Sequence, residues 1–186
     1  MSLFSKISIL LGILLLLFGT YLVFERYNPK RLGFDKIDQT SISSIKAYPK
    51  KITIPVLSIE LEIYPAKIKN NNWDATTKGV SYLSSSPVPG EAGNSILYGH
   101  NFPNLLGNLP KIKPGDEIKV TLSDGQKRTF VVEYTSVVTP GQTEILKSSN
   151  DIRITLYTCT GFLDSKRFVA VALLKEDLTG FYDASQ

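Results

Sequence analysis

The stretch Ile152-Arg-Ile-Thr-Leu-Tyr-Thr-Cys159 begins with alternating apolar and polar side chains and ends on the only cysteine of the chain. An alternation with a period of two predicts a β-strand. A second strand-like stretch, Ser95-Ile-Leu-Tyr-Gly-His100, ends on the only histidine. Imidazole can take up a thiol proton near neutral pH, and the thiolate is the nucleophilic form of cysteine. These two strand ends therefore predict a catalytic pair of cysteine and histidine.

An arginine is the third candidate for the same site. Cys159 is followed by a short polar loop and then by the apolar run Arg167-Phe-Val-Ala-Val-Ala-Leu-Leu174, which is typical of a buried strand. Two strands joined by so short a loop are expected to pair as a hairpin, which would place Arg167 beside Cys159. A guanidinium stays charged in proteins and can donate to a thiolate, a scissile carbonyl or an oxyanion. Arg153 is the rival candidate, but at about 3.3 Å per residue it lies roughly 20 Å along the strand from the thiol.

Each of the three residues also has a purely structural interpretation. A cysteine after an apolar strand is often a small buried hydrophobe. A lone histidine is often only a core or surface residue, and Arg167 could be an ordinary arginine at a strand edge. The residues alone leave both interpretations open.

Strand periodicity extends over the rest of residues 51–176, which are enough for one buried core. The alternating apolar positions are Ile59, Leu61, Ile63, Ile118, Val120, Leu122, Phe130, Val132, Tyr134, Ile152, Ile154 and Leu156. Ser123-Asp-Gly-Gln126 is typical of a hairpin turn, and Pro114-Gly115 and Pro140-Gly141 predict further turns. Many short strands at this spacing indicate a mainly β domain, either a closed barrel or a sandwich. Little helix is expected, one or two turns near Trp73–Gly79 and near Pro103–Asn108.

The segment Thr155-Leu-Tyr-Thr-Cys159 resembles the TLxTC signature of the sortases. These cysteine transpeptidases attach surface proteins to the Gram-positive cell wall or polymerise pilins. Gly93-Asn-Ser-Ile-Leu-Tyr-Gly-His100 is similar to a second segment of that family, and Arg167-Phe-Val-Ala-Val-Ala is similar to its strand carrying the active-site arginine. Ile52-Thr-Ile-Pro55, leading into Ile59-Glu-Leu-Glu-Ile63, resembles the family's first two strands. The resemblance covers about residues 50 to 175 and keeps the family's order of His, Cys and Arg.

The resemblance implies a single closed eight-stranded sortase-type β-barrel over residues 51–176. It also implies a reaction on an LPxTG-like sorting motif. Cys159 would attack the threonine carbonyl to give a thioester, His100 would transfer protons, and Arg167 would hold the substrate carbonyl and the oxyanion. Thr158, beside the nucleophile and facing the other side of its strand, is expected to help shape the substrate pocket, or to be only a β-favouring residue at a strand end.

The pilin-polymerising class of sortases is disfavoured by three features of the sequence. Members of that class usually carry a second membrane helix at the C-terminus, whereas no hydrophobic stretch follows residue 175. The Asp-Pro-aromatic lid motif of that class is missing before the core, and the loop from Cys159 to Arg167 has no room for a long helix. The other classes stay open.

An uncharged run from Ile7 to Phe24 predicts a membrane anchor over residues 1–25. Eighteen helical residues would span about 27 Å, close to the roughly 30 Å hydrocarbon core of a bilayer. A cleaved signal peptide is the alternative, but Thr20-Tyr-Leu-Val-Phe24 offers no small-residue cleavage site. Residues 26–50 are expected to be a linker or a loosely held arm, and residues 177–186 a C-terminal tail.

The side of the membrane on which the domain lies is predicted differently by charge and by resemblance. One lysine precedes the apolar run and four basic residues follow it within residues 26–36, which would favour a cytoplasmic domain. Sortases act outside the cell, and large domains translocate despite flanking charge. We therefore expect a single-pass membrane protein with an extracellular catalytic domain. One cysteine allows no intramolecular disulfide, so cysteine usage does not distinguish between compartments.

Composition restricts the possible partners. The net charge is +4, with scattered lysines and no basic-aromatic array, which gives nucleic-acid binding little support. Glu91, Glu144 and Asp151 could in principle surround a calcium ion, but their spacing is not a ligand motif. We expect no metal and no cofactor. The expected partners are secreted proteins with a C-terminal sorting signal, and a cell-wall precursor or another amine acceptor.

Two other functions remain possible at this level. The same residues would serve a cysteine endopeptidase or hydrolase in which water resolves the acyl-enzyme. A non-catalytic, membrane-anchored β-domain for adhesion or interaction would not need Cys159, His100 and Arg167 to converge. Their arrangement in space distinguishes this last possibility from the two enzymes.

Overall fold

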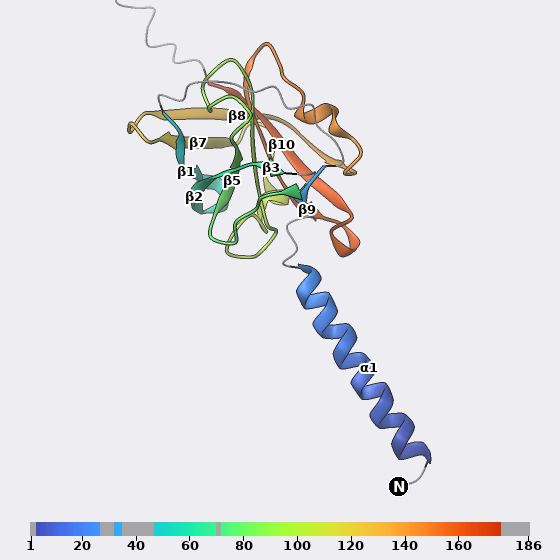
Figure 1. The fold of residues 1–186 in the computed structure, drawn as a ribbon. Coiled ribbons are helices and arrows are strands. Elements are labelled where there is room, and N and C mark those ends of the chain that lie inside the picture. The colour runs from blue at the N-terminus through green and yellow to red at the C-terminus, as the bar shows by residue number, and fades with distance from the viewer. Residues whose placement is uncertain (1–2, 27–31, 35–46, 70–71, 176–186) are drawn as a thin grey trace, which may run out of the picture.

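A β-barrel and a projecting helix make up the protein (Figure 1). The computed structural model describes residues 3–26, 32–34, 47–69 and 72–175. Helix α1 spans Leu3–Arg26. The strands are β1 Pro49–Ile54, β2 Ile59–Ala66, β3 Ile68–Lys69, β4 Asn72–Trp73, β5 Val80–Leu83, β6 Gly93–Gly99, β7 Glu117–Leu122, β8 Lys127–Val138, β9 Ile152–Thr160 and β10 Lys166–Leu174.

Eight of these strands close into a barrel in the order β1-β2-β5-β6-β9-β10-β8-β7. The closed eight-stranded barrel predicted from the sequence is thereby confirmed, and β3 pairs with β4 in a separate small sheet. Strand β9 lies between β6, to which it is parallel, and β10, to which it is antiparallel. The order of the strands brings residues near 100, 159 and 167 to one end of the barrel.

The two predicted hairpins are also confirmed. Strands β7 and β8 pair up to Thr121 and Lys127 around the turn, where Gly125 has a φ of 85° that favours glycine. Strands β9 and β10 pair along their whole length, and Cys159 lies directly opposite Arg167. The second hairpin fixes the relative position of two candidate site residues.

Alternation along β9 divides its side chains between two apolar clusters. Ile154 and Leu156 belong to the cluster that fills the barrel, together with residues from all eight strands. Tyr157 and Cys159 belong to a second cluster on the opposite face, which also contains Leu32, Phe34 and Trp73. Since successive side chains point to opposite sides of a sheet, the nucleophile candidate lies outside the barrel interior.

The predicted short helices are only partly correct. Four 3-10 turns occur among the described residues: η2 Pro55–Leu57, η3 Leu109–Lys111, η4 Thr143–Leu146 and η5 Phe162–Asp164. Residues 103–108 form hydrogen-bonded turns that lead into η3, so this expectation was displaced by a few residues. The prediction for Trp73–Gly79 was wrong, because Trp73 belongs to β4 and the carbonyl of Asp74 accepts the Tyr98 hydroxyl instead of a helical N–H.

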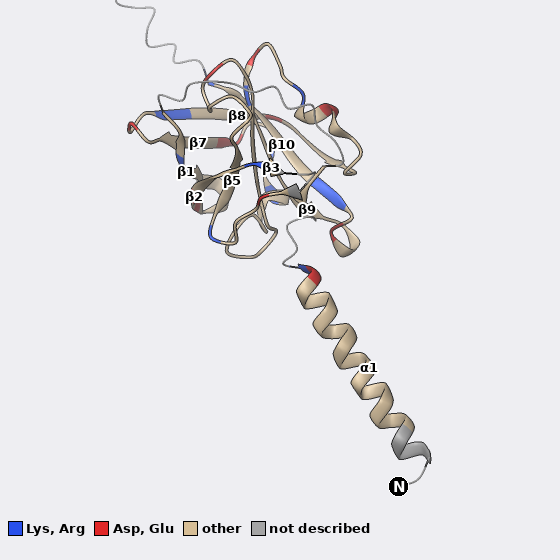
Figure 2. Cartoon of the chain, viewed as in Figure 1, with Lys and Arg blue, Asp and Glu red and all other residues tan. Residues whose placement is uncertain are grey.

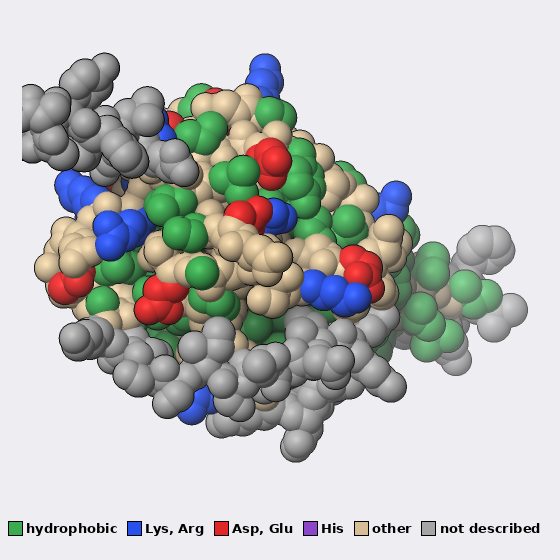
Figure 3. All heavy atoms as spheres, turned by 90° about the horizontal axis from the view of Figure 1, so that it is seen from above, with side chains coloured by type: hydrophobic (Ala, Val, Ile, Leu, Met, Phe, Trp, Pro, Cys, Tyr) green, Lys and Arg blue, Asp and Glu red, His purple; other side chains and the backbone are tan. Residues whose placement is uncertain are grey.

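Helix α1 is long and apolar enough to cross a membrane. It has no buried residue over Ile7–Arg26, and Figure 2 shows its described charges only at the end that meets the barrel. On the barrel face shown in Figure 3, acidic and basic side chains are interspersed rather than gathered in one patch. Most of the apolar helix surface has no contact with the barrel among the described residues, as expected for a segment placed in lipid, and its last turn, at Leu22 and Arg26, adjoins barrel residues.

The segments on either side of the barrel are described only in part. Most of the expected linker, residues 26–50, and all of the expected tail, residues 177–186, lie outside the described residues. Leu32 and Phe34 do not behave as a loose arm, because they are 0% and 4% exposed. The first strand begins at Pro49, just inside the expected linker.

Candidate functional site

His100, Cys159 and Arg167 lie at the same end of three adjacent strands. Cys159 pairs with Arg167 across β9 and β10, and Gly99 pairs with Thr158 across β6 and β9. His100, the residue after Gly99, therefore follows β6 at the level of Cys159. The side chains of His100, Cys159 and Arg167 are all buried, with exposures of 3–5%.

Arg167 is held by three backbone carbonyls. Its Nη1 donates to the carbonyl oxygens of Asp164 and Lys166 at 2.9 and 3.0 Å, and its Nη2 donates to that of Gly33 at 2.9 Å. The Nε atom is buried and has no hydrogen-bond partner among the described residues. A buried donor without a partner is costly, so Arg167 retains the capacity to bind one more oxygen.

The ring of His100 lies at one end of a short stack. It lies parallel to Phe102, with centroids 4.8 Å apart and planes at 9°, and the Arg26 guanidinium carbon lies 5.4 Å from the Phe102 ring centroid. Burial lowers the pKa of His100 from its ordinary value, and the Asp164 carboxylate acts weakly in the opposite direction. Folding therefore favours the neutral imidazole, the form that can accept a proton from a thiol.

Asp164 connects the histidine end of the site with the arginine end. Its carboxylate accepts a hydrogen bond from Asn101 Nδ2 at 2.8 Å, and its carbonyl accepts one from Arg167. Asn101 follows His100 in the sequence, so the turn after β9 is tied to the loop after β6. This contact was not predicted from the sequence.

Thr158 lies on the barrel side of β9, away from Cys159. It is fully buried, and its hydroxyl donates to the carbonyl of Gly99 at 2.8 Å. The bond ties β9 to the residue before His100. The structure thus gives Thr158 a positioning contact, and its expected part in shaping a substrate pocket stays a prediction.

An aromatic floor of Trp73, Tyr98 and Tyr157 extends from Cys159 over the outer face of the barrel. Tyr98 and Tyr157 stack with centroids 5.3 Å apart, and Trp73 contacts Tyr98 edge-on at 5.2 Å. The hydroxyl of Tyr157 is buried without a partner among the described residues, and burial raises its pKa well above the usual value. Strand alternation from Cys159 and from His100 could have identified both tyrosines, because each lies two residues before a candidate.

Residues 32–34 cover this floor, and we call them the strap. Phe34 contacts Tyr157 edge-on with centroids 5.1 Å apart, and the Trp73 Nε1 donates to the Phe34 carbonyl at 3.3 Å. Gly33 approaches Trp73 so closely that an added Cβ would lie 2.5 Å from Cδ1. The strap covers the floor, although the chain lacks the Asp-Pro-aromatic lid motif of the pilin-polymerising sortases.

Arg153 lies far from these groups. It pairs with Leu173 near the other end of β9 and β10, and its guanidinium binds the carboxylate of Asp151. This ion pair raises the pKa of Arg153 and lowers that of Asp151, mainly through the hydrogen bonds between them. Among the described residues, no group of three or more His, Cys, Asp or Glu side chains is arranged to hold a metal ion.

The lowered pKa of His100 predicts a pH dependence of stability. When a folded-state pKa lies below the unfolded value, stability is full above the unfolded pKa of about 6.5 and is lost as the pH falls toward the folded-state pKa. We expect the protein to lose more stability between about pH 7.5 and pH 5.5 than its His100→Gln variant does, since glutamine does not titrate. Thermal unfolding of the full chain in detergent, followed by the emission of Trp73, measures this difference. Equal losses in both proteins would contradict the assignment.

Comparisons with known proteins assign the barrel to one family. Residues 52–175 match the family model described as the sortase domain. Sortase A of Listeria monocytogenes is 30% identical over 129 residues, which cover 67% of this chain and 55% of that protein. The chain thus spans about half the length of this curated relative.

Solved structures share the barrel. The crystal structure of Listeria monocytogenes sortase A matches with a TM-score of 0.56 and 28% identity, over 68% of this chain and 86% of that chain. Sortase A from Corynebacterium diphtheriae matches with a TM-score of 0.60 and 25% identity, over 85% of this chain and 84% of that chain. The similarity to the second structure extends over more of this chain.

Proposed function

Because this chain belongs to the sortase family, we propose that it is a membrane-anchored cysteine transpeptidase. It would cleave an LPxTG-like sorting motif of secreted proteins and transfer the acyl part to an amine of the cell wall. The observation that carries the proposal is the strand register, which places Cys159 opposite Arg167 and level with His100. Helix α1 supports a retained single-pass anchor, and membership of the sortase family favours a barrel outside the cell.

The reaction begins at the thiol of Cys159. His100, neutral in the folded protein because of its burial, accepts the thiol proton, and the sulfur attacks the carbonyl carbon of the threonine. The carbon–nitrogen bond then breaks as the imidazolium gives its proton to the leaving glycine amine. The products of this half-reaction are a thioester on Cys159 and a released amine.

Arg167 stabilises the oxyanion that forms during this attack. Its Nε lacks a partner, and its Nη2 donates to the strap carbonyl of Gly33, an oxygen of the same type as a substrate carbonyl. A substrate oxygen that replaced the Gly33 carbonyl would meet a donor already fixed by Asp164 and Lys166. Donors fixed before the reaction stabilise developing charge without reorganisation.

The second half-reaction needs an amine that reaches the thioester. His100 accepts a proton from the incoming amine, the nitrogen attacks the thioester carbon, and the sulfur leaves as thiolate. The aromatic floor would hold the apolar residues of the acyl group. Thr158 would act as a positioning residue through its bond to Gly99, and the proposed reaction uses no cofactor.

Substitution of the three candidates tests the site. We expect Cys159→Ala to abolish cleavage of an LPxTG peptide, and His100→Ala and Arg167→Ala each to lower kcat/KM at least about a hundredfold, equivalent to ~2.7 kcal/mol. Arg153→Ala is the matched control, since its guanidinium pairs with Asp151 away from the site. Activity is measured with a quenched fluorescent peptide. An essential Arg153 with a dispensable Arg167 would show that the arginine is assigned wrongly.

The fate of the thioester distinguishes a transpeptidase from a hydrolase. Thioesters react readily with amines, so hydroxylamine or a short peptide with N-terminal glycine should divert the product from free acid to amine adduct. Mass spectrometry of the products at increasing amine concentration detects both species. Free acid alone at every concentration, from an enzyme that still cleaves, would favour the hydrolase.

The strap provides a test of where the substrate binds. A peptide that reaches Arg167 has to displace the Gly33 carbonyl, so loosening the strap should ease binding. Gly33→Ala would force a methyl group against Trp73, and we expect KM to fall about two- to tenfold while kcat changes little. Val56→Ala, at an exposed position outside the outer cluster, is the control. An unchanged KM in a folded Gly33→Ala protein would place the substrate elsewhere.

A further inference from the structure

The turn between β9 and β10 carries an exposed apolar tip. Phe162 is 85% exposed and Leu163 is 54% exposed, whereas Cys159, three residues before the tip, is buried. Large apolar side chains next to each other on a surface turn are unfavourable in water unless something covers them. Neither the proposed nucleophilic attack nor the arginine contact uses these two side chains.

The backbone holds the tip outward at some cost. Leu163 and Asp164 both have positive φ, at 49° and 58°, a conformation that non-glycine residues rarely adopt. The turn is fixed by the bond from Asn101 to the Asp164 carboxylate and by the bond from Arg167 to the Asp164 carbonyl. A strained and well-tied turn that exposes apolar residues is typical of a functional surface.

The tip lies beside the last turn of α1. Leu163 and Asp164 line one cavity together with Asn101 and with Leu22 and Arg26 of the helix. In Figure 1 the turn is at the end of the barrel that faces α1. Leu22 is four residues before Arg26, about 6 Å along the helix axis, so the cavity beside the tip extends over the last turn of α1.

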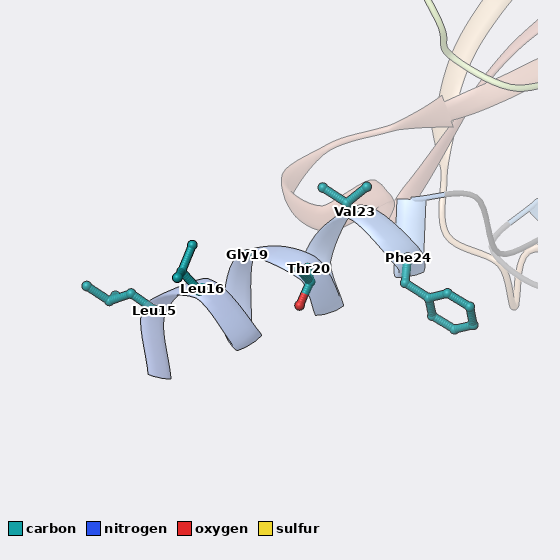
Figure 4. Close-up of a pocket in the computed structure, with 6 residues that line it drawn as sticks. All are labelled: Leu15, Leu16, Gly19, Thr20, Val23 and Phe24. Atoms are coloured by element: carbon teal, nitrogen blue, oxygen red, sulfur yellow. The ribbon is translucent and has the colours of Figure 1, made fainter. Parts of the chain in front are cut away.

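The side of the helix that carries Leu15, Leu16, Val23 and Phe24 is exposed in the described part of the structure. Leu15, Leu16, Val23 and Phe24 are each 61–75% exposed, and Figure 4 shows the side chains of this stretch extending away from the helix. If this surface lies in lipid, then the level of Leu22 lies in lipid as well. The tip would then be at the membrane surface rather than in bulk water.

Basic side chains flank the tip. Arg26 at the end of α1 and Lys166 at the start of β10 are both exposed, whereas the neighbouring acidic residues Glu25 and Asp164 are half-buried. Basic residues beside inserted apolar ones favour anionic membrane surfaces. The combination of two apolar side chains, two cations and an adjoining apolar helix matches a lipid surface better than a protein partner, for which two apolar residues offer a small patch.

We propose that Phe162 and Leu163 form a second membrane contact, inserted into the interface of the bilayer that α1 spans. The inference rests on the proposed membrane anchoring. Two contacts fix the orientation of the barrel, whereas a helix alone would allow it to rotate and tilt. Cys159 would thereby be kept close to the bilayer, where a membrane-bound substrate or amine acceptor could reach it.

A depth measurement on the full chain in vesicles tests this contact. The vesicles contain phosphatidylcholine and phosphatidylglycerol, and Cys159→Ser removes the only native thiol. An environment-sensitive fluorophore is attached at Ser165→Cys beside the tip, at Gln126→Cys on the exposed β7–β8 turn, or at Leu16→Cys within α1. Nitroxide lipids labelled at a shallow depth should quench Ser165→Cys at least about twofold more than Gln126→Cys.

The controls distinguish this contact from the anchor. Quenching at Leu16→Cys with none at Ser165→Cys would overturn the second contact and leave the anchor intact. No quenching at Leu16→Cys would overturn the anchor and this inference together. A fluorophore at Ser165→Cys that is shielded from water but not quenched by lipid would indicate a protein partner and would also overturn the proposal.

A further variant tests which residues make the contact. Phe162→Ser combined with Leu163→Ser should lower the quenching at Ser165→Cys to the level of Gln126→Cys, while Leu16→Cys stays quenched. The emission of Trp73 shows whether this variant is folded. Quenching that persists in the folded variant would overturn the role of these two side chains. If the variant does not fold, the quenching of Ser165→Cys with Phe162 and Leu163 in place still tests the membrane contact.

Discussion

The pairing of β9 with both of its neighbours is the constraint on which the site depends. One pairing places Arg167 opposite Cys159, and the other places Gly99 opposite Thr158, so that His100 follows at the level of the thiol. A shift of one residue in either pairing would turn a required side chain to the wrong face of the sheet. The hydrogen bond from Thr158 to Gly99 secures the pairing nearest the site. Barrel closure thus does more than build a core, since it also determines which side chains meet.

Burial and hydrogen bonds set the chemical character of His100 and Arg167. His100 is favoured in its neutral form because burial removes the water that would solvate the charged ring, and three carbonyls hold the Arg167 guanidinium in place. One of those carbonyls is that of Gly33 in the strap, which covers the aromatic floor. The chain's own residues therefore cover this face, and the proposed substrate would have to displace the strap to reach Arg167.

Much of this arrangement could be predicted from the sequence. The alternation in Ile152–Cys159 and the apolar run after Arg167 predict a hairpin, and the hairpin is what places the arginine beside the cysteine. The strand character of the core follows from the same periodicity. The choice of a closed barrel needed the family resemblance, because periodicity describes single strands and not how the last strand meets the first.

Contacts between distant residues without a periodic signal could not be predicted. Leu32 to Phe34 lie in a polar segment, and their burial depends on Trp73 and Tyr157, which are distant in sequence. The tie between Asn101 and Asp164 depends on two loops that meet only when the barrel closes. Trp73 was expected near a helical turn, but its strand pairing with Ile68 prevailed over local propensity. The φ values of Leu163 and Asp164 likewise had no signal in residue type.

The central claim is that Cys159 forms an acyl-enzyme with the sorting peptide, and the mass of the intact chain tests it most directly. After brief incubation with an LPxTG peptide and no added amine, the account predicts a mass increase equal to the acyl fragment, located on Cys159 and released by hydroxylamine. Cleavage of the peptide without any such adduct, or an adduct on another residue, would contradict the account.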